Sequence, residues 1–102
     1  MDDYQERDRS INIEYQLENL PNKVEGFIKR LDKETLRRLS EAFDYILKSP
    51  FHHDNPTIIK RLHGKKEGLY RYCLGSIRFI YRVDRKMKKI RILEIDNRGD
   101  IY

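Results

Sequence analysis

The alternation of apolar and polar residues is strongest in the last third of the chain, where three short stretches read as strands. Aromatic and β-branched side chains, which fit a pleated and half-buried surface, fill residues 69–74, 77–83 and 90–95. Gly75 and Ser76 separate the first two stretches. A two-residue loop that begins with glycine favours a type II′ turn, because glycine takes positive φ at little steric cost. The pattern therefore predicts a three-stranded antiparallel meander.

The short loop also determines which side chains share a face of the sheet. Leu74 would lie opposite Ile77, and side chains alternate between the two faces along each strand. The face that we assign to the core carries Tyr70, Tyr72, Leu74, Ile77, Phe79 and Tyr81. The other face carries Arg71, Cys73, Arg78, Ile80 and Arg82. Because the hairpin brings arginines and no carboxylate to this face, we expect an open cationic surface for an anionic partner. A register wrong by one residue would instead expose the aromatic side chains to RNA.

The first half of the chain predicts one strand and two helices. Residues 10–17 alternate between apolar and polar side chains, which is typical of a strand with one buried face. Apolar residues at helical spacing follow Pro21, and Asp32 is placed to cap a second helix. The apolar stripe of that helix is Leu36, Leu39, Phe43, Ile46 and Leu47. Ser49-Pro50 ends it, because the residue before a proline disfavours the helical conformation.

Residues 50–68 read as an irregular connection that Ile58, Ile59 and Leu62 attach to the core. The predicted order is a strand, two helices and three strands. This is an α+β fold in which an αα-hairpin packs on one face of an antiparallel sheet. The nine residues at the start are almost wholly polar, so we expect a flexible tail over 1–9 and a single domain over 10–102.

Charge is unevenly distributed along the 102 residues. The net charge is +5. Residues 1–60 carry 10 Lys and Arg against 12 Asp and Glu, whereas residues 61–102 carry 12 against 5. Basic runs usually form solvated faces, but their concentration in the half that forms the sheet favours a nucleic-acid phosphate ligand. Lys65, Lys66 and Arg82 are candidate contacts to RNA phosphates.

The sequence gives little support for a disulfide-stabilised, membrane-spanning, metal-binding or cofactor-dependent protein. The single cysteine excludes an internal disulfide and fits a reducing compartment. No run approaches the roughly 20 apolar residues that span a membrane, so we expect a soluble cytoplasmic protein without a membrane partner. The three histidines lack the spacing of zinc ligands, and no phosphate-binding loop or catalytic triad occurs. We therefore expect neither a metal nor a cofactor.

A set of short motifs resembles the RelE/ParE superfamily of bacterial and archaeal toxins from toxin–antitoxin systems. The motifs are Leu62-His63-Gly64, Leu69-Tyr70-Arg71-Tyr72, Leu74-Gly75, Arg78, Tyr81-Arg82 and Asn97-Arg98-Gly99-Asp100-Ile101-Tyr102. The upstream strand and helical hairpin are similar too, so the resemblance covers residues 10–102. It implies a RelE-like fold and a toxin that a cognate antitoxin holds inactive in a hetero-oligomer.

The resemblance also implies candidate catalytic residues. RelE-like members cleave mRNA in the ribosomal A site, and their catalytic positions match Arg71, Arg78, Arg98 and Tyr102. Two positions depart from the pattern. Cys73 stands where the family commonly has a second lysine or arginine, and Asn97 stands where many members have histidine.

RNA cleavage by the ribose 2′-hydroxyl requires proton removal, charge neutralisation on phosphorus and protonation of the leaving oxygen. The arginines suit the second task, because a guanidinium binds phosphate with two N–H groups and stays charged. Tyr102 would position a base or move a proton. Cys73 is a neighbour of this site or only a small filler of the sheet surface. The general base stays unassigned.

Three functions fit these residues. The expected one is a ribosome-dependent mRNA endoribonuclease that inhibits translation, with the antitoxin, the ribosome and mRNA as partners. ParE-like members inhibit DNA gyrase and are not nucleases, which is the first alternative. The second alternative is a weakly active or decayed toxin that only binds its antitoxin.

Overall fold

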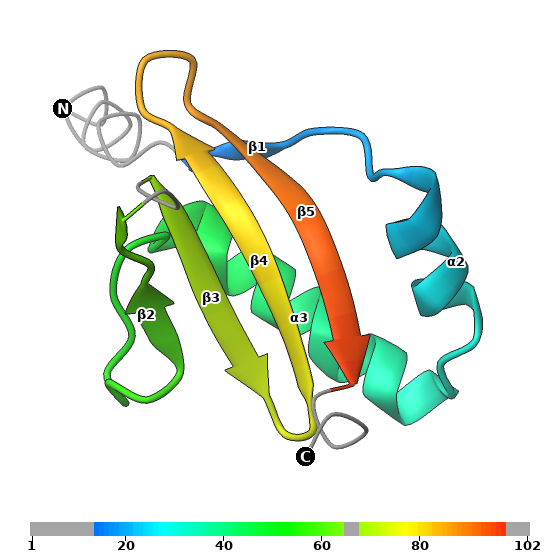
Figure 1. Ribbon diagram of the computed structural model, residues 1–102. Coiled ribbons are helices and arrows are strands. Elements are labelled where there is room, and N and C mark those ends of the chain that lie inside the picture. Colours follow the sequence, from blue (N-terminus) through cyan, green and yellow to red (C-terminus); the bar gives the residue numbers. More distant parts are fainter. Residues whose placement is uncertain (1–13, 65–67, 98–102) are drawn as a thin grey trace, which may run out of the picture.

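The computed structural model describes residues 14–64 and 68–97, which form a five-stranded sheet and two helices (Figure 1). The elements are β1 (Gln16–Leu17), α2 (Asn22–Lys29), α3 (Lys33–Lys48), β2 (Ile59–Arg61), β3 (Leu69–Leu74), β4 (Ile77–Asp84) and β5 (Lys89–Asn97). The strand order is β1-β5-β4-β3-β2. The β1 strand runs parallel to β5, and every other pair is antiparallel. The predicted α+β fold is confirmed. Neither helix in this part of the chain is long and apolar enough to cross a bilayer.

The hairpin of β3 and β4 has the predicted register. Leu74 pairs with Ile77, and Arg71 pairs with Ile80. Gly75 begins the turn with a φ of 61°, a region that glycine adopts most readily. The stacked rings of Tyr72 and Phe79, with centroids 5.0 Å apart, lie in the core of the molecule. The assignment of the aromatic face to the core is therefore confirmed.

The two helices cover the aromatic face. In Figure 1, α3 crosses behind the sheet and α2 lies beside β5. Asp32 caps α3 as predicted, since its carboxylate accepts a hydrogen bond of 2.8 Å from the Thr35 amide. Leu39 and Ile46 of the predicted stripe are buried. Leu36 is 41% exposed, because it lies in the first turn of α3 and the stripe enters the core one turn later.

Two segments differ from the expectation. Of the predicted strand over 10–17, only Gln16–Leu17 is a strand within the described residues, and the tail 1–9 lies outside them. The prediction of an irregular connection over 50–68 is wrong at Ile59–Arg61, because these residues form the edge strand β2 beside β3. Three residues are too few to show an alternating pattern, and neighbouring Pro56 reads as a breaker. This strand adds a side chain to the open face that the sequence did not place there.

Candidate functional site

Two transverse rows of side chains cross the sheet face that α3 leaves uncovered. Direct cross-strand partners form the first row, which contains Cys73 of β3, Arg78 of β4 and Asp96 of β5. The second row contains Lys60 of β2, Arg71 of β3, Ile80 of β4 and Glu94 of β5. Paired residues lie on the same face of a sheet, and residues two apart along a strand do as well. The predicted residues Arg71, Cys73 and Arg78 therefore come together.

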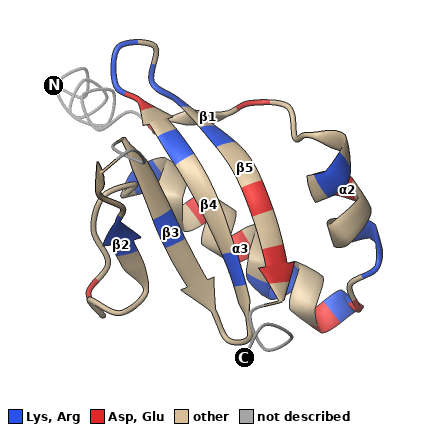
Figure 2. Cartoon of the chain, in the orientation of Figure 1, with Lys and Arg blue, Asp and Glu red and all other residues tan. Residues whose placement is uncertain are grey.

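Charge changes sign across this face. Figure 2 shows basic positions on β2, β3, β4 and the start of β5, and acidic positions along the second half of β5. The expectation of a wholly cationic face is thus wrong at β5, where Glu94 and Asp96 lie. The face offers cations to an anionic group over its middle strands and carboxylates at one border.

A bulge in β5 explains why these carboxylates were missed. Ile90 and Ile92 are buried, so simple alternation would place Glu94 and Asp96 on the core side as well. The pairing shifts between Ile80 and Tyr81, which lie opposite Glu94 and Ile92, so that Leu93 is an additional residue. A bulge of this kind redirects the side chains that follow it. Glu94 and Asp96 consequently face outward.

Arg78 and Asp96 form an ion pair across the first row. The Arg78 Nε lies 3.3 Å from the Asp96 Oδ1, with 24% of the arginine side chain and 47% of the aspartate side chain exposed. The pair joins β4 to β5 near the end of the sheet where the β3–β4 turn lies. It combines a group that binds phosphate with a group that accepts protons.

Arg71 and Lys60 are neighbours in the second row. The Arg71 Nε is buried and has no hydrogen-bond partner among the described residues. Unsatisfied buried donors are uncommon in native structures. Lys60 is exposed on the edge strand β2 and adds a second positive charge beside Arg71. Lys60 was not among the site residues predicted from the sequence. The β-branched pair Ile58-Ile59 just before it was the available indication of a strand.

The remaining predicted residues are more distant or lie elsewhere. Arg82 is exposed further along β4 and pairs with Arg91 of β5, whose Nε is 2.8 Å from the Glu18 Oε1. Cys73 is half-buried. The candidates Lys65, Lys66, Arg98 and Tyr102 lie outside the described residues.

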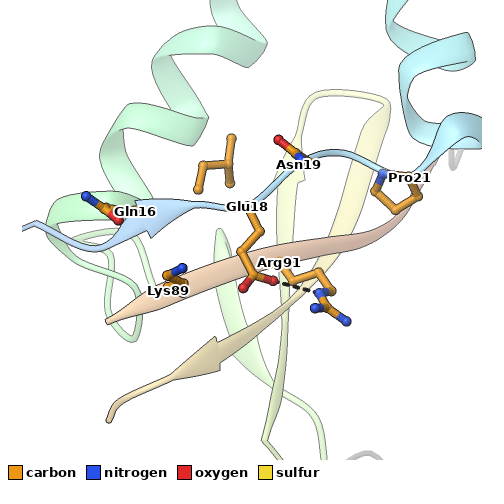
Figure 3. A pocket seen from close by; sticks show the side chains of 7 residues that line it. Gln16, Glu18, Asn19, Pro21, Lys89 and Arg91 are labelled. Carbon is orange, nitrogen blue, oxygen red and sulfur yellow. Dashed lines mark hydrogen bonds and ion pairs between the residues drawn. The ribbon is translucent and has the colours of Figure 1, made fainter. Parts of the chain in front are cut away.

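A hollow at the β1 edge lies apart from both rows. It has a volume of about 570 Å³ and is lined by Gln16, Leu17, Glu18, Asn19, Pro21, Lys89 and Arg91 (Figure 3). The ion pair between Glu18 and Arg91 spans it. None of the predicted site residues lines this hollow. Within residues 14–64 and 68–97, no three metal-ligating side chains converge to hold an ion.

Comparison with known proteins gives structural matches only. No protein-family model matches the chain, and no curated protein sequence does. The archaeal RelE–RelB complex from Pyrococcus horikoshii contains a chain that is 30% identical, with a TM-score of 0.71. That match covers 85% of this chain and 98% of the archaeal one.

Two more distant structures share the fold. The toxin–antitoxin complex RelBE2 from Mycobacterium tuberculosis matches at 22% identity and a TM-score of 0.67, over 84% of this chain and 100% of that one. A YoeB/ParE toxin from Agrobacterium tumefaciens matches at 15% identity and a TM-score of 0.64, over 83% and 98%. At these identities the likeness concerns the fold alone.

Proposed function

This chain belongs to the RelE/ParE superfamily of toxins from toxin–antitoxin systems, and from that premise we propose that it is an endoribonuclease that cleaves mRNA on the ribosome. The observation that carries the proposal is the cationic part of the open face, where Arg71, Lys60 and Arg78 lie on adjacent strands. Arginine and lysine side chains bind the phosphate oxygens of nucleic-acid backbones. The proposed reaction needs no metal, because the ribose 2′-hydroxyl is the nucleophile.

Charge neutralisation is the role proposed for the arginines. When the 2′-oxygen attacks phosphorus, negative charge grows on the non-bridging oxygens, and guanidinium groups fixed in position stabilise it. Arg71 and Arg78 provide two such groups from neighbouring strands. We assign Arg98 to the same clamp and Tyr102 to base positioning or proton transfer, on the resemblance alone. Arg82, Lys65 and Lys66 are proposed as outer phosphate contacts.

The position of Cys73 bears on how strongly the site binds phosphate. The family commonly has a cation there, whereas this chain has a half-buried thiol next to Arg78. Lys60 lies on the other side of Arg71 and supplies a positive charge at a different place in the same face. We propose that Lys60 compensates in part for the cation that Cys73 replaces.

An antitoxin is the proposed protein partner. Two of the similar structures are complexes of a toxin with its antitoxin. An acidic or amphipathic segment that orders on binding would suit the cations on β2, β3 and β4. We propose that such a segment covers Arg71 and Arg78, or displaces Tyr102, and thereby keeps mRNA away in the cytoplasm.

An in vitro translation reaction with the purified protein tests the nuclease proposal. Primer extension on the mRNA should show new ends inside the reading frame that are absent without ribosomes. Arg78→Ala should lower cleavage by about 10²-fold or more, as expected when a charge-stabilising group is lost. Arg37→Ala is the matched control, because Arg37 is an exposed arginine of α3 that pairs with Glu34 and Glu41. Full cleavage by a folded Arg78→Ala variant would contradict the assigned role.

Gyrase inhibition is the second candidate function. The thiol of Cys73 in place of a cation favours it, because an inhibitor that binds protein needs no complete phosphate clamp. Intact mRNA with normal translation, together with loss of gyrase supercoiling activity, would support this candidate over the nuclease. Binding of the antitoxin without either activity would identify a decayed toxin.

A further inference from the structure

We propose that Asp96 is the general base of the cleavage reaction and accepts the proton of the ribose 2′-hydroxyl. This inference rests on the proposed nuclease function. It assigns a task that neither the arginines nor Lys60 perform, since all are cations without a free acceptor. Asp96 lies on the open face in the same transverse row as Arg78.

The bulge in β5 puts Asp96 within reach of RNA. Without the bulge, Leu93 would be an ordinary strand residue, and alternation from Ile92 would turn Asp96 toward the core. With it, nearly half of the Asp96 side chain is exposed. Bulges next to active sites commonly redirect one side chain in this manner.

Contact with a phosphate-binding group distinguishes Asp96 from the other acceptors on this face. The Asp96 Oδ1 is 3.3 Å from the Arg78 Nε. A phosphate held by the Arg78 guanidinium therefore brings its own ribose next to this carboxylate. Glu94, one row away, lies opposite Ile80 and has no such partner across the strand. Cys73 lies on the far side of Arg78 and is half-buried.

The proposed step balances as an internal displacement. The 2′-oxygen forms a bond to phosphorus while an Asp96 carboxylate oxygen takes its proton. The bond from phosphorus to the 5′-oxygen breaks, and that oxygen receives a proton from water. The products are a 2′,3′-cyclic phosphate and a 5′-hydroxyl end, and Asp96 then returns its proton to water.

Two charge-matched variants test this role. Asp96→Asn and Glu94→Gln each remove one negative charge from the same strand and the same face. We expect Asp96→Asn to lower single-turnover cleavage of mRNA on ribosomes by about 10²–10⁴-fold, the usual contribution of a general base. Binding to mRNA-programmed ribosomes should not weaken, since a repulsive charge is lost. Glu94→Gln should cleave close to the rate of the unaltered protein.

The pH dependence of cleavage separates a base from a structural partner. Groups that face Asp96 are Arg78 from β4, Cys73 beyond it on β3 and Glu94 on its own strand. The pH–rate profile of Asp96→Asn should differ from that of the unaltered protein, whereas Glu94→Gln should keep the unaltered profile. Asp96→Ala with added formate provides a second test, in which formate should restore part of the rate.

Three outcomes would overturn the inference. Cleavage by Asp96→Asn at the normal rate, or faster in parallel with Glu94→Gln, would show that Asp96 only screens Arg78. If Asp96→Asn does not fold, failure of formate to restore Asp96→Ala decides against the base. If the unaltered protein does not cleave mRNA, the nuclease function itself fails, which the first reaction reveals before any variant is used.

Discussion

A single buried hydroxyl joins the sheet to the connection that carries β2. The Tyr81 hydroxyl donates a 2.6 Å hydrogen bond to the carbonyl of Pro50, and the Tyr81 side chain has no exposed surface. Burial raises the pKa of Tyr81 above its ordinary value near 10. The folded protein therefore holds Tyr81 protonated at a pH where the unfolded chain releases the proton.

Removal of that hydroxyl should lower stability and change its pH dependence. We expect Tyr81→Phe to reduce the free energy of unfolding by about 1–3 kcal/mol, because the Pro50 carbonyl loses its donor. Stability of the unaltered protein should be constant with respect to this group below about pH 10 and fall above it, since the pKa is raised on folding. Tyr81→Phe should lack this contribution to the alkaline decline. Urea unfolding between pH 8 and pH 11 measures both effects.

Tyr72→Phe is the control for this prediction. Tyr72 is also buried, but its hydroxyl makes no hydrogen bond within residues 14–64 and 68–97. Loss of the Tyr72 hydroxyl should therefore lower the free energy of unfolding at neutral pH by less than loss of the Tyr81 hydroxyl. Equal destabilisation by the two substitutions would show that the Pro50 bond contributes nothing measurable.

At the scale of elements, the short strand β2 combines an anchor with a charge. Ile59 is buried against the core, and the next residue, Lys60, is exposed beside Arg71. The Ile58 carbonyl also accepts a 2.9 Å hydrogen bond from the Cys73 amide, which fixes β2 to β3. The strand therefore holds a flexible lysine at a defined position on the open face.

Lys60→Ala should weaken RNA binding without affecting the fold. Binding to mRNA-programmed ribosomes, measured over a salt series, should have a slope less negative by about 0.7, the value for one phosphate contact on a single strand. Lys33→Ala, at the exposed start of α3, removes the same charge from another element and serves as the control. An unchanged slope in Lys60→Ala would mean that β2 carries no phosphate contact.

Sequence patterns predicted those elements whose signals are local. The turn at Gly75 and the alternation on both sides of it determined the register of β3 and β4, and hence that Arg71, Cys73 and Arg78 share a face. The β2 strand was not predicted, because its three residues gain their structure from pairing with β3. The outward direction of the Asp96 side chain was not predicted, because it depends on a bulge in the pairing of β5 with β4. Simple alternation along β5 does not include such a bulge.

At the scale of the whole molecule, the sheet has one face covered by helices and one face divided by charge. Cations lie on β2, β3, β4 and the start of β5, and the carboxylates Glu94 and Asp96 lie on the second half of β5 (Figure 2). An RNA backbone or an acidic antitoxin segment would bind best over the cationic strands and be repelled at the β5 border. Both ligands would therefore compete for the cationic strip, which is the part of the two rows that contains Lys60, Arg71 and Arg78.

Cys73 provides a direct test of this competition. It is the single cysteine of the chain, it is half-buried, and its direct cross-strand partner on β4 is Arg78. Iodoacetamide should alkylate Cys73 slowly in the free toxin and hardly at all in toxin purified with its antitoxin, because a segment over Arg78 also covers the thiol. Mass spectrometry of the alkylated fraction over time measures the protection.

A second single-cysteine variant distinguishes two causes of protection. The antitoxin could cover Cys73 directly, or its binding could reduce opening of the whole fold. In Cys73→Ser combined with Ser40→Cys, the reactive thiol moves to an exposed position on α3, on the other side of the sheet from the cationic strip. Its alkylation should be equally fast with and without antitoxin if the antitoxin binds the open face. Protection at position 40 with none at Cys73 would place the antitoxin on the helices and leave the strip to RNA alone. Inhibition would then require a change transmitted through the sheet.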